Sequence, residues 1–432
     1  MDVDQLLYHY VTDGIANNHR NLVGMELEYP IIALNGGAIT LDFVKPMFDS
    51  LAPLGFTVSR RASDGTTLAV KDADGHTLTF DTCYENLEFA SGSTKTMEEI
   101  YRRFRQVLKT VQHTLEPFGL AVAGAGCNPL LRQPHMIESE LTLDIAEYFR
   151  NNPVQRRFSK DFYCRISSEQ VHFNTTVEEL PLIFEAFTRL DWLNILLFSD
   201  SPMALGDQKF LCVRNELYTQ SPFRKIGVAG AQNLGMTTAM DIARSYRDVG
   251  LFMRRRDGKL SVFSPVKVSD YFAREDALPE DINCLDLERN IVTTSYGTVE
   301  YRILCSQPFT EAFVPSAFNL GLRVRLQDTL EAARAFDRRF QPPEPNERNR
   351  QASMGNHPFA PRQDVTALAK ELLAISRQGL LERGYGEERF LAPLENRDGI
   401  LDSPARRLMR AESEQGVKRA FEERTIIGED IL

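Results

Sequence analysis

The most constraining feature of this sequence is a strand-like run that carries two carboxylates two residues apart. In LVGMELEYPII, residues 22–32, apolar side chains surround Glu26 and Glu28. Side chains at positions i and i+2 of a β-strand project from the same face, so these two would lie side by side. Adjacent carboxylates repel unless a cation or a proton lies between them. An isolated pair of this kind more often marks the solvent face of a half-exposed strand.

The same spacing of polar residues recurs in three further strand-like runs. The three pairs are Asn86 and Glu88, His172 and Asn174, and Glu300 and Arg302. Four such strands in one sheet would line one face with carboxylates, an imidazole, amides and a guanidinium. Oxygen ligands favour Mg²⁺ or Mn²⁺, and a single histidine makes Mn²⁺ acceptable without favouring Zn²⁺. The pattern therefore indicates a metal site suited to a polyphosphate.

Each pair also has a structural alternative. A lone histidine on a strand is more often a hydrogen-bonded core residue than a ligand. Arg302 is equally suited to a salt bridge with Glu300. At this level both alternatives stay open.

The bulk composition limits the partners and the compartment. The 432 residues include 50 Lys and Arg against 60 Asp and Glu, a net charge of -10, so neither nucleic acid nor an anionic membrane is an expected partner. The six cysteines lie far apart without a CxxC motif, which indicates reduced thiols and no structural zinc. The N-terminus lacks a signal-peptide pattern, and no apolar run approaches a membrane span, so we predict a cytoplasmic protein.

Periodicity predicts a mixture of strands and helices without a strict βαβ rhythm. An amphipathic start is followed by strands at 22–32, 120–126, 169–177, 259–266 and 298–304, and by a hairpin at 68–81 around an Asp-Gly turn. Helices are predicted at 97–118 and near 178–198, 236–249 and 310–338. The Pro- and charge-rich segment 338–350 is predicted to be an exposed connector. Residues 1–340 would form a catalytic core, and 341–432 a helical C-terminal segment packed on the same domain.

At the polar pairs the sequence resembles the glutamate-cysteine ligase family, in the broad sense that includes the bacterial carboxylate-amine ligases. VGMELEYP is similar to the family's GxExE strand, DTCYENLEFASG to its second acidic block, QVHFN to its HxN strand and VEYRIL to its ExR strand. SDSPMALG followed by VRNELY resembles a Ser-Pro…Ser-x-Arg region, with Cys212 in place of the serine. NRQASMG, QGLLERGYGEE and SPARRL resemble features of the carboxylate-amine branch. The resemblance covers roughly residues 20–410.

The resemblance implies the α+β catalytic fold of the glutamine synthetase/guanido kinase-like superfamily. A curved, mainly antiparallel sheet would form the active site on its concave face and carry helices on its outer face. The implied metal ligands are Glu26, Glu28, Asp81, Glu88, His172 and Glu300. The implied catalytic residues are Arg302, Glu28 and Glu88. The residues implied in nucleotide binding are Asn174, His172 and Arg302, and those implied in substrate binding are Arg214, Glu85 and Asn86.

The resemblance also implies a reaction. ATP would phosphorylate the γ-carboxylate of glutamate, and an amine, with cysteine as the default, would attack the acyl phosphate. ATP and Mg²⁺, or Mn²⁺ in its place, are the expected cofactors, and the expected partners are small molecules. No Walker A motif is present, so metal coordination would hold the phosphates. Three alternatives stay open: a ligase joining another amino acid, amine or peptide end in a natural-product pathway, a non-catalytic nucleotide-binding homologue, and a metal-dependent hydrolase.

Overall fold

The computed structural model describes residues 2–18, 22–137, 163–205, 207–285 and 287–425. Nine strands of the described ranges form one sheet, in the order β14-β15-β7-β1-β5-β4-β3-β2, with β6 beside β1. All pairings in this sheet are antiparallel. The strands are β1 (Val23–Ala33), β2 (Thr57–Arg61), β3 (Thr67–Lys71), β4 (Thr77–Phe80), β5 (Asn86–Ala90), β6 (Leu120–Val122), β7 (Ser168–Phe173), β14 (Ile291–Thr293) and β15 (Val299–Cys305). The chain is therefore an α+β protein, as predicted.

The register of the sheet separates a polar face from an apolar face. Glu28 is the direct partner of Glu88, and His172 is the direct partner of Glu300. Directly opposed residues of antiparallel strands lie on the same face, so these side chains share one side of the sheet. The alternate residues of β1, such as Leu27, are fully buried on the other side.

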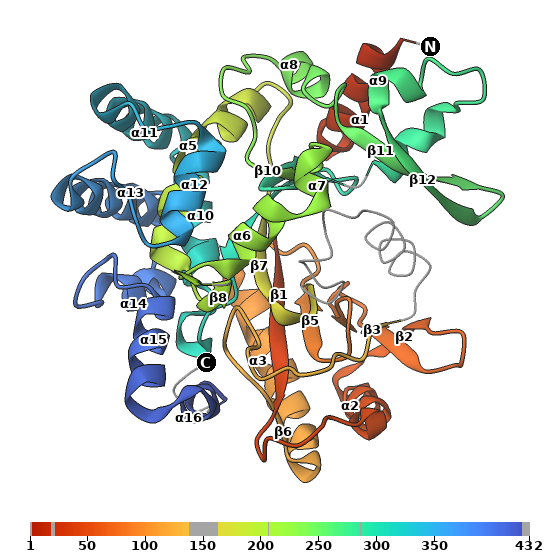
Figure 1. Ribbon diagram of the computed structural model, residues 1–432, viewed down its shortest axis with the longest axis vertical. Helices are drawn as coiled ribbons and strands as arrows, with labels where there is room; N and C mark the ends of the chain where they lie inside the picture. Colours follow the sequence, from red (N-terminus) through yellow and green to blue (C-terminus); the bar gives the residue numbers. More distant parts are fainter. Residues whose placement is uncertain (1, 19–21, 138–162, 206, 286, 426–432) are drawn as a thin grey trace.

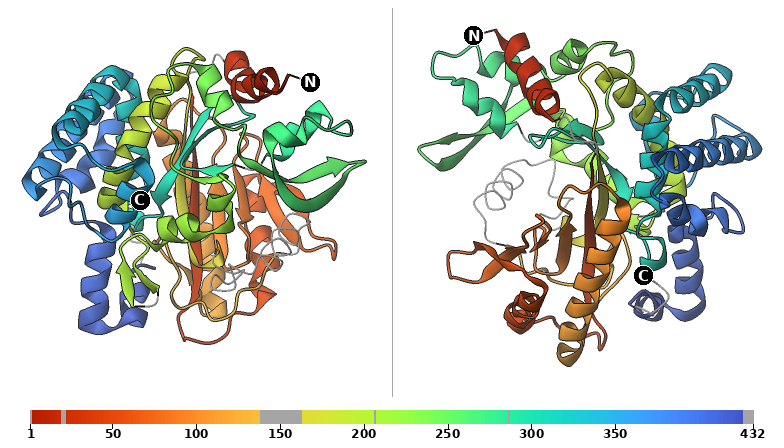
Figure 2. Two further views of the ribbon diagram at one scale, coloured as in Figure 1. Left: turned by 45° about the horizontal axis from the view of Figure 1, so that its top comes forward. Right: turned by 180° about the vertical axis from the view of Figure 1, so that it is seen from behind.

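Helices cover the apolar face. Those that pack on it include α3 (Met97–Leu115), α5 (Leu180–Phe198) and α10 (Val314–Val324). Tyr29 of β1 stacks on Phe104 of α3 with ring centroids 5.8 Å apart, and Phe187 of α5 meets Tyr301 of β15 at 4.9 Å. Figures 1 and 2 show the C-terminal helices gathered on one side of the sheet and the hairpin of β11 (Gly250–Arg256) and β12 (Lys259–Lys267) projecting on the other.

Shorter elements surround these layers. The remaining helices are α1 (Val3–Asn17), α2 (Val44–Asp49), α6 (Val213–Gln220), α7 (Pro222–Lys225), α8 (Ala239–Arg244), α9 (Val268–Tyr271), α11 (Leu326–Phe340), α12 (Pro345–Ser353), α13 (Arg362–Arg383), α14 (Ala392–Glu395), α15 (Pro404–Gln415) and α16 (Val417–Glu423). Three strand pairs complete the described chain: β8 (Met203–Leu205) with β9 (Gln208–Phe210), β10 (Ala229–Gly230) with β13 (Glu288–Arg289), and β11 (Gly250–Arg256) with β12 (Lys259–Lys267). Among the described helices, none is both long and apolar enough to cross a bilayer.

Most predicted elements are confirmed, and four are corrected in extent. The helix expected near 236–249 is only α8, which begins at a capping box formed by Thr238 and Asp241 and ends where Ser245 and Tyr246 bond to carbonyls three residues back. The helix expected over 310–338 is α10 and α11, because Arg325 adopts a non-helical conformation with φ -99° and ψ 46°. The strand expected over 169–177 ends at Phe173, and the strand expected over 120–126 ends at Val122.

The prediction of an exposed connector at 338–350 holds only for residues 341–344, which link two helices. Helix α11 runs to Phe340, and α12 begins at Pro345 and buries Arg348 and Asn349. Arg348 and Asn349, which contributed to the prediction of exposure, serve as buried hydrogen-bonding groups: Asn349 Nδ2 donates to Asp191 Oδ2 at 3.2 Å. Composition alone does not distinguish a solvated segment from a buried polar network. A division of the chain near residue 340 stays a prediction.

Candidate active site

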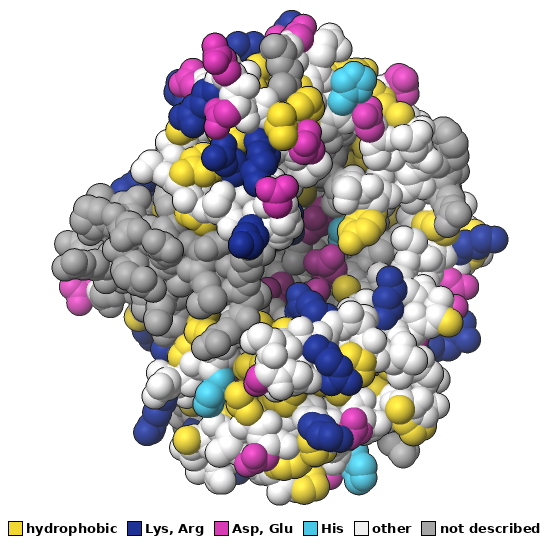
Figure 3. Space-filling model, turned by 90° about the vertical axis from the view of Figure 1, so that its right-hand side faces the viewer, with side chains coloured by type: hydrophobic (Ala, Val, Ile, Leu, Met, Phe, Trp, Pro, Cys, Tyr) yellow, Lys and Arg dark blue, Asp and Glu magenta, His cyan; other side chains and the backbone are white. Residues whose placement is uncertain are grey.

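Three ligand-type side chains from adjacent strands meet on the polar face of the sheet. Glu26 of β1, His172 of β7 and Glu300 of β15 each offer one donor atom, and these atoms all lie within 4.8 Å of one another. The register brings them together, because His172 is opposite Glu300 on one side and opposite Gly24, two residues before Glu26, on the other. Figure 3 shows a hollow in which Asp and Glu side chains gather. We call these three residues the cation triad.

The imidazole of His172 is fixed at both nitrogens. Its Nε2 lies 3.4 Å from Glu26 Oε1, and its Nδ1 lies 3.1 Å from Thr298 Oγ1. Burial lowers the pKa of His172, but the hydrogen bond to Glu26 and the charge of Glu300 outweigh burial and raise it. In the metal-free protein, a proton on His172 therefore offsets part of the repulsion between the two carboxylates.

Glu28 has a different environment from Glu26, although the two share a face of β1. Its Oε2 accepts from Ser168 N at 2.9 Å and from Asn86 Nδ2 at 3.3 Å, and its Oε1 accepts from Ser168 Oγ at 2.5 Å and from Gln170 Nε2 at 3.4 Å. Burial raises the pKa of Glu28 despite these bonds. Four neutral donors use the four lone-pair positions of a carboxylate. Glu28 can bind a cation only if a donor gives up its place.

Two further carboxylates crowd against Glu28. Glu88 is its direct partner across β1 and β5, and burial together with the charges of Glu26, Asp81 and Glu28 raises the pKa of Glu88 well above its ordinary value. Burial and the charges of Glu28 and Glu288 raise the pKa of Asp81 to about 7. Like charges held this close destabilise the ionised state of the site, and a cation would relieve that cost.

The guanidinium of Arg302 lies between two carboxylates. It is paired with Glu300, two residues earlier on β15, and its Nη2 lies 2.9 Å from Glu288 Oε2 of β13. Burial lowers the pKa of Arg302, but the charges of Glu300 and Glu288 raise it well above its ordinary value. Arg302 therefore forms the salt bridge that was its structural alternative. Its guanidinium is a fixed positive charge beside the cation triad.

A second buried cation, Arg214, comes from α6. Its backbone amide donates to Ser201 Oγ at 3.2 Å, and its guanidinium lies over the Tyr218 ring, 5.2 Å from the centroid. Within the described ranges, no carboxylate lies at ion-pair distance from it, and its field acts to lower the pKa of Glu28. Arg214 and Arg302 line the same narrow polar cavity. A buried guanidinium in this position suits a substrate carboxylate.

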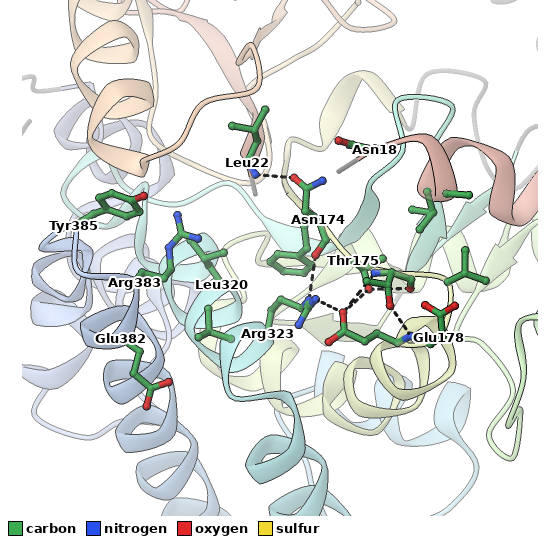
Figure 4. A pocket seen from close by; sticks show the side chains of 17 residues that line it. Asn18, Leu22, Asn174, Thr175, Glu178, Leu320, Arg323, Glu382, Arg383 and Tyr385 are labelled. Carbon is green, nitrogen blue, oxygen red and sulfur yellow. Dashed lines mark hydrogen bonds and ion pairs between the residues drawn. The ribbon is translucent and has the colours of Figure 1, made fainter. Parts of the chain in front are cut away.

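Asn174 does not join the cation triad. It follows the last residue of β7, where its Oδ1 accepts from Leu22 N at 2.8 Å, and its buried Nδ2 has no partner among the described residues. The side chain borders a cavity of about 870 Å³ lined by residues of α1 and by the C-terminal ends of α10 and α13 (Figure 4). Its wall carries charges of both signs, from Arg323 and Arg383 and from Glu178, Glu179 and Glu382. Asn174 therefore belongs to a neighbouring pocket.

The two remaining residues predicted to bind substrate have other contacts. Glu85 is fully buried and accepts from His135 N at 3.0 Å, and its carboxylate also contacts the His135 ring. Asn86 supports Glu28, and its Oδ1 accepts from Ser167 Oγ at 2.6 Å. A direct role in substrate binding stays a prediction for both.

Sequence reasoning missed three residues that shape this site. Ser168 and Gln170 lie four and two residues before His172 on β7, so the period-two rule that selected His172 applies to them as well. Glu288 gave no such signal, because β13 is only two residues long and pairs with β10 rather than with the main sheet.

The triad fits a hard divalent cation. Two carboxylates and one imidazole suit Mg²⁺ or Mn²⁺ better than Zn²⁺, whose sites are richer in histidine and cysteine. The raised pKa of His172 indicates that the site favours positive charge. A second group of possible ligands, Asp72, Asp74 and His76, lies at the β3–β4 turn, where Asp72 is already bound by Arg103 at 2.9 Å.

Comparison with solved structures bears on the fold. The chain is similar in fold to a bifunctional glutathione synthetase from Pasteurella multocida, with a TM-score of 0.55 and 14% identity over 98% of this chain and 52% of that one. It also matches a glutamate–cysteine ligase from Francisella tularensis in complex with AMP, with a TM-score of 0.49 and 12% identity over 95% and 88% of the two chains. This chain thus spans about half the length of the Pasteurella enzyme. A comparison with curated proteins gave no match.

The family assignment comes from the sequence. Residues 75–423, most of the chain, match glutamate-cysteine ligase family 2 (GCS2). The matched range includes Asp81, Glu88, His172, Glu300 and Arg302. The chain belongs to glutamate-cysteine ligase family 2.

Proposed function

We propose that this protein is an ATP-dependent carboxylate–amine ligase that forms a γ-glutamyl amide through a glutamyl phosphate, with cysteine as the acceptor amine. The observation that carries the proposal is the meeting of Glu26, His172 and Glu300 beside Arg302 in a member of this family. Each element of the site answers a requirement of that reaction.

The chemistry needs an activated carboxylate. A carboxylate is a poor electrophile because its oxide does not leave, whereas a phosphate does. Transfer of the γ-phosphoryl group to glutamate gives an acyl phosphate, and attack by the amine then releases phosphate. Mg²⁺ bound at the triad would neutralise the phosphate oxygens. Arg302, always charged and presenting a planar fork, would stabilise the negative charge of the transferring phosphoryl group.

The cavity beside Asn174 suits the nucleoside end of ATP. Asn174 follows His172 by two residues, so the cavity adjoins the triad along β7. The buried Nδ2 of Asn174 has no partner among the described residues, and the wall offers both arginine and glutamate side chains to the polar groups of a nucleoside. Asn174→Leu should therefore weaken ATP binding by about 1–3 kcal/mol while leaving Mn²⁺ binding at the triad intact. An unchanged ATP affinity in this variant would remove the pocket from the nucleotide site.

Arg214 would bind the acid substrate. It has no carboxylate partner among the described residues, and it lies near Glu28 at the opposite end of the polar face from Asn174. Arg214→Lys keeps the charge but loses the two-pronged geometry, so KM for the acid should rise more than KM for ATP.

The decisive experiment measures ADP release with Mg-ATP, glutamate and a panel of amines. Each component is omitted in turn, and the products are identified by mass spectrometry. The proposal expects ADP release that requires both the acid and an amine, and a product with the mass of the amide. Absence of amine-dependent ADP release with every combination contradicts the ligase function. ADP release without an amide product favours a hydrolase.

Two variants connect the activity to the site. Glu300→Gln removes a triad carboxylate and should abolish turnover while the protein stays folded. Glu331→Gln changes an exposed acid on α11 and serves as the matched control with full activity. A product formed with another amine, and not with cysteine, keeps the ligase class and changes the acceptor.

A further inference from the structure

Arg302 forms ion pairs with two carboxylates, and only one of them belongs to the cation triad. Glu300 pairs with Arg302 and is also a member of the cation triad. Glu288 pairs with Arg302 at 2.9 Å and is not in the triad. A divalent cation bound at the triad would attract the Glu300 carboxylate and cancel much of its charge, which weakens its hold on the guanidinium. Glu288 is the partner that keeps its charge for Arg302 in the loaded site.

The backbone around Glu288 is fixed by buried contacts. Its own amide donates to Val228 O at 3.0 Å, which ties β13 to β10. The next residue, Arg289, is 8% exposed, and its Nη1 donates to Gln232 Oε1 at 2.6 Å. A carboxylate on this segment has little freedom to follow the guanidinium if it moves.

The same segment also holds the backbone of Arg302. Arg302 N donates to Asn290 O at 2.8 Å, at the point where the pairing of β15 with β7 becomes irregular after Tyr301. Asn290 is in turn held by Asp191, to which its Nδ2 donates at 2.7 Å. Residues 288–290 therefore contact Arg302 at its amide and at its guanidinium, and fix both ends of a long flexible side chain.

We propose that Glu288 is a positioning residue that holds Arg302 in the orientation needed for phosphoryl transfer. This inference rests on the proposed function of Arg302 in an ATP-dependent ligase. Glu288 contacts neither ATP nor the cation in this role, and acts through the guanidinium. Misplacement of a charge-stabilising group by about 1 Å can cost a factor of about a hundred in rate.

The test compares Glu288→Gln, Glu288→Asp and Glu300→Gln with the wild type. Glu288→Gln should lower kcat by about tenfold to a hundredfold with KM for ATP unchanged, because an interaction made in the transition state is lost. Glu288→Asp keeps the charge and should restore part of the rate. Mn²⁺ titration followed by electron paramagnetic resonance should show wild-type binding in Glu288→Gln and lost binding in Glu300→Gln. Glu280→Gln, an exposed acid in the preceding segment, is the control.

A second measurement is independent of turnover. Phenylglyoxal modifies free guanidinium groups, and the rate of modification at Arg302 is followed by mass spectrometry of the digested protein. Release of one partner should make Arg302 in Glu288→Gln react several-fold faster than in the wild type, with Glu288→Asp in between. Modification at the wild-type rate, or a wild-type kcat, overturns the inference. Loss of Mn²⁺ binding in Glu288→Gln also overturns it, by making Glu288 a ligand. If the wild type releases no ADP with any amine, the proposed function fails, and the modification rates still decide whether Glu288 holds Arg302.

Discussion

Asp81 lies close to other carboxylates, and the free energy that its negative charge costs the folded protein can be measured by unfolding. Burial and the charges of Glu28 and Glu288 raise its pKa from 3.8 to about 7. The folded protein therefore binds the Asp81 proton more tightly than the unfolded chain. Stability from this proton is fully present below about pH 4 and is lost as the pH rises through 7. A difference of about 3 between the two pKa values corresponds to about 4 kcal/mol.

The substitution Asp81→Asn removes this titration and keeps the shape of the side chain. In urea unfolding with EDTA, the variant should be more stable than the wild type by about 4 kcal/mol at pH 8 and by about 2 kcal/mol at pH 5, where the unfolded chain has lost most of its proton and the folded protein has not. Excess Mg²⁺ should reduce the difference in unfolding free energy between Asp81→Asn and the wild type at pH 8. A bound cation stabilises the ionised carboxylate of the wild type, whereas the neutral Asn gains less from it.

A matched control uses an exposed acid. Asp64 lies at a surface turn, where hydrogen bonds from Thr66 lower its pKa, so Asp64→Asn should give no stability gain at pH 8. Equal stability of Asp81→Asn and the wild type at pH 8, or a difference that does not change between pH 5 and pH 8, would refute the reasoning that Asp81 is held close to other carboxylates at a cost.

Two further perturbations test the triad and the helix packing. Because the pKa of His172 is raised by Glu26 and Glu300 against the effect of burial, a proton competes with the cation, and Mn²⁺ affinity should rise between about pH 5.5 and 8. His172→Gln should flatten that dependence, and an equally steep dependence in the variant would contradict it. A Cβ at Gly321 would lie 2.2 Å from a backbone oxygen of α13, so Gly321→Ala should destabilise the fold by about 1–3 kcal/mol in thermal unfolding. A Cβ at Gly399 would have no atom within 4 Å, so Gly399→Ala is the control. Equal melting temperatures of the two variants would contradict the close packing of α10 against α13.

The local pattern of apolar and polar residues was sufficient to predict several strands of the sheet and most of the polar pairs of the site. The alternation in LVGMELEYPII predicts β1 and its two faces, and the Asp-Gly turn predicts the β3–β4 hairpin, because both signals depend only on neighbouring residues. The polar pairs of β1, β5, β7 and β15 share a face as expected, apart from Asn174. The family resemblance implied a curved, mainly antiparallel sheet, but the order of its strands was not predicted, since pairing between distant segments leaves no mark in a local pattern.

Asn174 shows why the pattern failed at a strand end. Its side-chain oxygen accepts the amide of Leu22, a bond that a continuing ladder would give to a backbone carbonyl. Asparagine competes with the backbone in this way and ends regular structure. The HxN spacing therefore places histidine on the polar face and asparagine at the edge of a neighbouring cavity.

Glu26 and Glu28 show the limit of the same reasoning inside a strand. Both occupy equivalent positions in one alternating run, and the sequence gives no reason to treat them differently. Their roles differ because β7 presents His172 to Glu26, and presents Ser168 and Gln170 to Glu28. The first carboxylate retains lone pairs for a cation, whereas the second is saturated by neutral donors. If Glu28 is a ligand in the loaded enzyme, cation binding must displace one of these donors, and Ser168→Ala should then tighten Mn²⁺ binding instead of weakening it.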